Sequence, residues 1–228
     1  MKREDFWRTF ALNRELHVAG AFIYDGIQDL RLLESFDYSD EVFQFAYHLA
    51  VGFERLLKIA VVLLEFTDQI DPTEFEKSLI THNHSVMLQR VKALTSIKLK
   101  SEDNELLDIL GKFYKSYRYD NFSLSSVSAE SSLTRTLVNY FDKRIPDFRG
   151  GDEVLGEAPA CSDAIRYFTG GVCRRIASQL YTAITDAARQ HSLYTYELRC
   201  DSKAFKVFML DELHFGKEEL LWKELGKR

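Results

Sequence analysis

Apolar residues recur at helical spacing along most of the chain. In the clearest stretch they step by 4, 3, 4 and 3 positions, at Leu49, Phe53, Leu56, Ala60 and Leu63. This repeat places apolar side chains on one face of an α-helix. A hydroxyl residue followed by two acidic residues, as at Ser39 to Glu41, is typical of a helix start. The pattern therefore predicts a helix that begins at Ser39 and ends near Thr67.

A second strong stripe predicts a helix over residues 161–190. It is formed by Ile165, Thr169, Val172, Ile176, Leu180, Ala183 and Ala187. Gly170 and Gly171 in its middle predict a kink or a close helix contact. Weaker helical patterns cover 3–19 and 21–35, separated at Gly20, and 73–80, 82–94, 102–118 and 129–143.

Two stretches break the helical pattern. Residues 145–160 hold two of the three prolines and three of the eleven glycines, which is typical of a long loop or joint. After Tyr194, alternating apolar residues predict a small β-hairpin with its turn at 201–203, and residues 217–228 predict a short closing helix. We therefore expect a mainly α, up-and-down helical bundle with a core over 1–144, a joint over 145–160, and a segment 161–228 that completes the bundle and adds an appendage.

Composition and charge narrow the function classes. The net charge of −5 gives no global basic field, so any contact with nucleic acid has to come from a local patch. The longest apolar run, residues 59–64, is too short to span a membrane, and the first residues lack an apolar signal core. The three cysteines form no CxxC pair and are expected to be buried and reduced. These features predict a cytoplasmic protein without a membrane interaction.

No known cofactor or metal motif is present. The sequence has no GxxxxGK[ST] and no GxGxxG phosphate loop. His82 and His84 flank Asn83, but on a helix their side chains would diverge by about 200°, and no carboxylate or cysteine lies at a useful spacing. We expect no cofactor and no metal, and interpret the two histidines as groups at a helix start or core edge unless they carry a non-metal function.

Several cations lie beside the predicted apolar faces. Arg55 and Lys58 follow the stripe of the 39–67 helix, and Glu54 and Lys58 form an i,i+4 pair. They are either part of a solvated face or directed into a cleft between helices. Arg118 ends the 102–118 helix among aromatic residues, either as a helix-end cation or as a phosphate contact beside stacking surfaces.

Three segments resemble the HEPN family of helical-bundle proteins. They are "FERLLKIAVVLLE" (53–65), "THNHSVMLQRV" (81–91) and "LLDILGKFYKSYRYDNFS" (106–123). Family members often combine a Glu-x-x-x-Lys helix, a His-Asn or His-Asp segment, and an aromatic helix that ends in Arg-Tyr. Here Glu54–Lys58, His82 or His84, and Arg118–Tyr119 stand in those places, within residues 40–125. The resemblance implies a homodimeric bundle in toxin–antitoxin, antiviral-defence or RNA-processing systems.

The same resemblance implies which residues act on a substrate. Many members are metal-independent ribonucleases in which an arginine holds the phosphate and a histidine a few residues later moves a proton. Here no histidine follows Arg118 at that short spacing, so the sequence leaves open whether the protein is catalytic. We expect Arg118 to contact phosphate and His82 or His84 to carry the proton. The expected RNA- or nucleotide-binding residues are Arg55, Lys58, Tyr114 and Tyr119.

An alternative belongs to another class of protein. Because the motif histidine is absent and the net charge is negative, a non-catalytic bundle that binds another protein also fits the sequence. The two classes differ in one spatial feature. If Arg118, Arg55 and a histidine converge in one cleft, chemistry is favoured, and if they lie on separate faces, protein binding is favoured.

Overall fold

The fold was examined in a computed structural model of the chain. It describes residues 3–116, 133–146, 148, 159–193, 198–210 and 215–216, with side chains from Thr9 onward. The described part forms the eight helices α1 (Arg3–Leu32), α2 (Ser39–Glu65), α3 (Pro72–Ser78), α4 (His84–Leu94), α5 (Ser101–Lys115), α6 (Leu133–Asp142), α7 (Asp163–Gln190) and α8 (Lys203–Phe208). It contains no strand, only an isolated antiparallel bridge between Ser35 and Ala160. The predicted mainly α bundle is confirmed.

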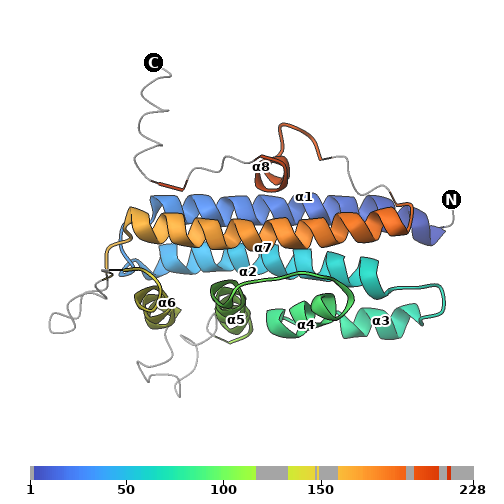
Figure 1. The fold of residues 1–228 in the computed structure, drawn as a ribbon, viewed down its shortest axis with the longest axis horizontal. Helices are drawn as coiled ribbons and strands as arrows, with labels where there is room; N and C mark the ends of the chain where they lie inside the picture. Colours follow the sequence, from blue (N-terminus) through green and yellow to red (C-terminus); the bar gives the residue numbers. More distant parts are fainter. Residues whose placement is uncertain are drawn as a thin grey trace.

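Three long helices form the body of the bundle. Helices α1, α2 and α7 pack against one another with their axes nearly aligned, α3 to α6 lie along one side of α2, and α8 crosses the opposite side near α1 (Figure 1). Helix α2 is central because it contacts α1, α4, α5, α6 and α7. This position explains its sequence, since a helix surrounded by neighbours has apolar residues on several faces.

The boundaries of α2 agree with the sequence pattern. The helix begins at Ser39, carries Asp40 and Glu41 in its first turn and ends at Glu65. The residue that precedes the helix is Tyr38, and no side chain caps the first turn, so the expected hydroxyl cap is not formed. The acidic residues of the first turn stabilise this helix start instead, because their negative charges lie at the positive end of the helix dipole.

The predicted break at Gly20 is wrong. Helix α1 continues through this residue without interruption. The reason for the glycine is the crossing of α8, because a Cβ atom on Gly20 would lie 2.5 Å from the Cα of Ala204. Gly170 in α7 has a similar role, since a Cβ there would lie 2.2 Å from Cδ1 of Phe215. Both glycines permit close packing.

The predicted hairpin near the C-terminus is also wrong in its second half. Residues 203–208 form helix α8, which starts where the Ser202 side chain accepts a hydrogen bond from the amide of Phe205. The buried residues Ala204 and Val207 are three positions apart, so one face of a helical turn explains them as well as a strand does. The first predicted strand covers residues 196–200, of which 196 and 197 lie outside the described residues and 198–200 form no strand.

Other predictions can be followed only in part. Helix α7 begins after Ser162, whose side chain accepts from the Ile165 amide, and it contributes to the same apolar core as α1 and α2. Cys161 and Cys173 are buried as expected, whereas Cys200 is exposed. Most of the joint and the closing helix over 217–228 lie outside the described residues. Among the helices described, none is long and apolar enough to cross a membrane.

Candidate functional site

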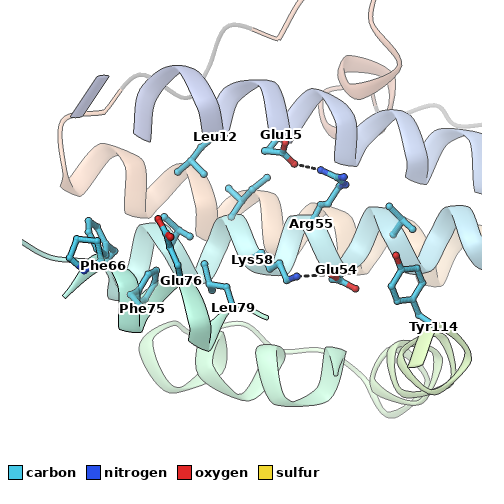
Figure 2. A pocket seen from close by; sticks show the side chains of 14 residues that line it. Leu12, Glu15, Glu54, Arg55, Lys58, Phe66, Phe75, Glu76, Leu79 and Tyr114 are labelled. Atoms are coloured by element: carbon cyan, nitrogen blue, oxygen red, sulfur yellow. Dashed lines mark hydrogen bonds and ion pairs between the residues drawn. The ribbon is translucent and has the colours of Figure 1, made fainter. Parts of the chain in front are cut away.

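A pocket of about 750 Å³ opens between α1, α2 and α3, with Tyr114 of α5 at one end (Figure 2). Its volume lies within the range of small-molecule sites. The side of α2 that faces it carries Val51, Glu54, Lys58 and Val62 at helical spacing. The pocket is therefore built mainly on one face of the central helix.

The two ends of the pocket differ in chemistry. Figure 2 shows Phe66, Phe75 and Leu79 at one end, and Glu54, Lys58 and Tyr114 toward the other. Phe66 and Phe75 are packed ring against ring, with centroids 5.1 Å apart. The pocket thus has a mostly apolar α3 end, where Glu76 is the ionisable residue, and a more polar end near Tyr114 of α5.

The carboxylate of Glu54 organises the polar end. It accepts a hydrogen bond from Nζ of Lys58 at 2.7 Å and lies 2.9 Å from Nδ1 of His82, while its side chain is only 11% exposed. Burial by itself would raise the pKa of Glu54, but the hydrogen bonds and charges of Lys58 and His82 outweigh it and lower the pKa below its ordinary value. Glu54 is therefore a stable anion at neutral pH.

His82 is held at this end from two sides. Its Nδ1 faces Glu54, and its ring packs edge-on against Tyr114, with centroids 4.8 Å apart and an interplanar angle of 60°. The side chain is 45% exposed. Because Nδ1 is occupied by the carboxylate, Nε2 is the nitrogen that can exchange a proton with a ligand. We call Glu54, Lys58, His82 and Tyr114 the Glu54 cluster.

The two histidines proposed as proton carriers have opposite surroundings. Asn83 caps α4 by accepting from the Val86 amide at 3.1 Å, which fixes the chain direction between them. His84 is fully buried and packs against Gly111, where a Cβ atom would lie 3.2 Å from the backbone nitrogen of His84. Burial lowers the pKa of His84 to about 4, against a smaller opposing effect of Glu54. His84 is thus neutral and shielded, and only His82 can meet a substrate.

The predicted binding cations line the pocket, but they already have partners. Arg55 of α2 forms an ion pair with Glu15 of α1, and Lys58 is paired with Glu54 (Figure 2). An anionic ligand has to compete with these carboxylates or share the cations with them. Tyr114 also lines the pocket, whereas Arg118 and Tyr119 lie outside the described residues.

Sequence reasoning missed the central member of the site. Glu54 was recognised only as the i,i+4 partner of Lys58, although it also binds His82, 28 positions away. One signal was available, because Glu54, like its neighbour Arg55, is a charged residue between the apolar residues Phe53 and Leu56. A buried charge among apolar neighbours requires a partner, and such pairs often mark functional sites.

The cluster joins the three segments that carry the family resemblance. Glu54 and Lys58 come from the first segment, His82 from the second and Tyr114 from the third. Within the described residues, no group of three or more His, Cys, Asp or Glu side chains is arranged to hold a metal ion. No family model, curated protein or solved structure matches the chain at a significant level.

Proposed function

We propose that the chain is a HEPN-like protein that binds RNA or a nucleotide at the Glu54 cluster, as part of a homodimeric toxin–antitoxin or defence system. One observation carries this proposal. Residues from three separate segments, each corresponding to a part of the family pattern, meet within hydrogen-bond or ring-contact distance. If the three segments were an accidental likeness, nothing would require their polar residues to converge.

The cluster has the groups needed for metal-independent RNA cleavage. Nε2 of His82 is suited to take the proton of a ribose 2′-hydroxyl, while the Glu54 carboxylate stabilises the imidazolium that results. The 2′-oxygen then attacks the adjacent phosphorus, a 2′,3′-cyclic phosphate forms, and the 5′-oxygen leaves with a proton from solvent. Lys58, 2.7 Å from Glu54, supplies positive charge near the phosphate.

Incubation of purified protein with mixed RNA in EDTA tests this function. We expect cleavage that leaves cyclic-phosphate ends, reduced at least 100-fold by His82→Ala, in line with the size of general-base effects. His191→Ala is the matched control, since His191 is an exposed histidine at the end of α7. Intact RNA that still binds through the cluster leaves a binding role without catalysis. The absence of both cleavage and binding overturns the proposal.

A second function is favoured by a different observation. Both pocket cations are already paired, and the α3 end of the pocket is mostly apolar, with Pro72, Phe75 and Leu79 beside Glu76. A groove of this kind suits the apolar face of a partner helix. Under this function, peptides selected for binding should lose affinity on Leu79→Arg, while His82→Ala has little effect. Under RNA binding the opposite order is expected, because Leu79 lies at the end of the pocket away from Tyr114 (Figure 2).

A further inference from the structure

Four rings form a continuous series of contacts that ends at His82. The centroids of Phe43 and Tyr47 are 6.1 Å apart with nearly parallel planes, at 8°. Those of Tyr47 and Tyr114 are 6.0 Å apart at 31°, and Tyr114 packs on His82 at 4.8 Å. We call these four residues the aromatic strip. Its two last members belong to the Glu54 cluster, so the strip leads directly into the candidate site.

The strip lies at the surface, unlike two of the four phenylalanine and tyrosine residues of α2. Phe43 is 41% exposed, and Tyr47 and Tyr114 are partly exposed, whereas Phe45 and Phe53 of the same helix are fully buried. Phe43 and Tyr47 are one helical turn apart, and Glu54 and Lys58 follow on the same side of α2. Core packing explains Phe45 and Phe53. Phe43 also packs edge-on against the buried Phe113, with centroids 5.2 Å apart, and Tyr47 and Tyr114 pack in part against the core, so core packing explains the buried parts of these rings but not their exposed parts.

Charge near the strip favours a polyanion at one end. The last turn of α5, which contains Tyr114, carries two exposed lysines, Lys112, which is paired with Asp108 at 2.7 Å, and Lys115. The first turn of α2, before Phe43, carries Asp40 and Glu41. A phosphate backbone is therefore attracted at the Tyr114 end and repelled at the Phe43 end.

We propose that the aromatic strip is a stacking track for the bases of single-stranded RNA, with Tyr47 and Tyr114 as its main platforms. This inference rests on the proposed function, because it assumes that the Glu54 cluster receives a phosphate of the same strand. Aromatic platforms beside cations are the usual means of holding single strands without a fixed sequence. The strip thus selects unpaired RNA, whose bases are accessible, over duplex RNA.

The difference in charge between the two ends of the strip predicts which rings contribute most to RNA affinity. Tyr47 should contribute more than Phe43, because Phe43 adjoins the acidic first turn of α2. Replacing one stacking ring with alanine typically weakens binding by about 5- to 150-fold. We expect a loss of about 10-fold for Tyr47→Ala and a smaller loss for Phe43→Ala.

Fluorescence anisotropy with two labelled oligomers tests the track. One probe is a single-stranded oligouridine, and the other has the same sugar–phosphate backbone without bases. Wild type should bind the oligouridine about 10-fold more tightly than the abasic probe, and Tyr47→Ala should remove most of this preference. Tyr167→Ala, which removes from α7 a tyrosine that is 48% exposed, is the control and should keep it.

The outcomes separate this inference from the function on which it rests. If wild type binds neither probe, the proposed function fails. If wild type binds the oligouridine and loses affinity in His82→Ala, but Tyr47→Ala keeps the full preference for bases, the track is overturned and the function stands. Thermal melts of Tyr47→Ala and Phe43→Ala, with Lys112→Met and Lys115→Met as folded comparison variants, identify any loss that comes from unfolding.

Discussion

Two histidine–carboxylate pairs among the described residues are built alike and surrounded differently. In one, Nδ1 of His82 lies 2.9 Å from Glu54, and in the other, Nδ1 of His48 lies 2.6 Å from Asp29. The first pair joins α2 to the segment before α4 at the pocket, whereas the second joins α2 to α1. Both histidines also pack against an aromatic ring, His82 on Tyr114 and His48 on Phe22.

A lysine makes the difference between the pairs. Burial raises the pKa of Asp29, and the hydrogen bond and charge of His48 only partly offset it. At Glu54 the same effect of burial is outweighed, because Lys58 adds a second hydrogen bond and a positive charge. The comparison indicates that Glu54 is kept as a carboxylate, whereas the Asp29 pair mainly ties two helices together.

The largest expected effect concerns acid stability near the Glu54 pair. The pKa of His84 is lowered to about 4 from 6.5, so the folded state excludes a proton that the unfolded chain binds. Its contribution is fully present above pH 6.5 and is lost as the pH falls to about 4, a loss of about 3 kcal/mol. Urea unfolding from pH 7 to 4 should show a flatter pH dependence in His84→Leu than in wild type. Equal slopes would contradict this.

The next largest effect comes from a substitution that should disturb the contact between α1 and α2, near the His48 pair, and leave the His82 pair in place. A Cβ atom on Gly52 would lie 2.7 Å from Cγ1 of Ile23, at the contact between α1 and α2. We expect Gly52→Ala to lower the free energy of unfolding by about 2 kcal/mol through overpacking. NMR chemical shifts should change at His48 and remain nearly constant at His82, which precedes α4 and contacts α2 through Glu54. Changes of similar size at both histidines would show that the pairs are not independent.

Removal of the lysine should make the two pairs alike. In Lys58→Met, Glu54 loses a hydrogen bond and a nearby cation, so its pKa should rise, as that of Asp29 does. Carboxyl ¹³C titration measures this directly, and the free energy of unfolding at pH 7 should fall by about 1 kcal/mol. Lys77→Met is the control, because Lys77 pairs with Glu74 at the exposed surface. An unchanged Glu54 titration would remove the lysine from the explanation.

The smallest effect concerns Asp29 itself. Because its pKa is raised, it favours the folded state most below its unfolded value of 3.8, and this contribution is lost as the pH rises through the folded pKa. At pH 7, Asp29→Asn should therefore change the free energy of unfolding by less than about 1 kcal/mol. Chemical unfolding at pH 7 and pH 3 measures the difference. A large loss at pH 7 would indicate that the charge of Asp29, and not only its hydrogen bond to His48, holds α1 to α2.

The helices were predictable where apolar residues repeat over many turns. Helices α2 and α7 follow from their stripes, because their faces are buried along their full length. Gly20 and the segment after Ser202 were not, because the crossing of α1 and α8 depends on residues far apart in sequence. A local pattern cannot show that a glycine serves a distant helix, nor distinguish one buried helical turn from a short strand.

The sequence pointed to several residues of the Glu54 cluster, but not to the contacts that join them. The pair of Glu54 and Lys58 follows from i,i+4 spacing, but the contact of Glu54 with His82 depends on how the segment before α4 returns to α2. His82 and His84 look equivalent in the sequence, and the cap at Asn83 with the space at Gly111 decides which is exposed. The rings of Phe43 and Tyr47 can be recognised as part of a longer aromatic series only from the structure, which places Tyr114 beside Tyr47.

The most direct test of the Glu54 cluster as the functional site compares the two histidines in one assay. Affinity for single-stranded RNA is measured at fixed salt for wild type, His82→Gln and His48→Gln. The account predicts that His82→Gln weakens binding by about 10-fold or more, while His48→Gln stays within about twofold of wild type. Equal losses in the two variants, or no loss in His82→Gln, would contradict it.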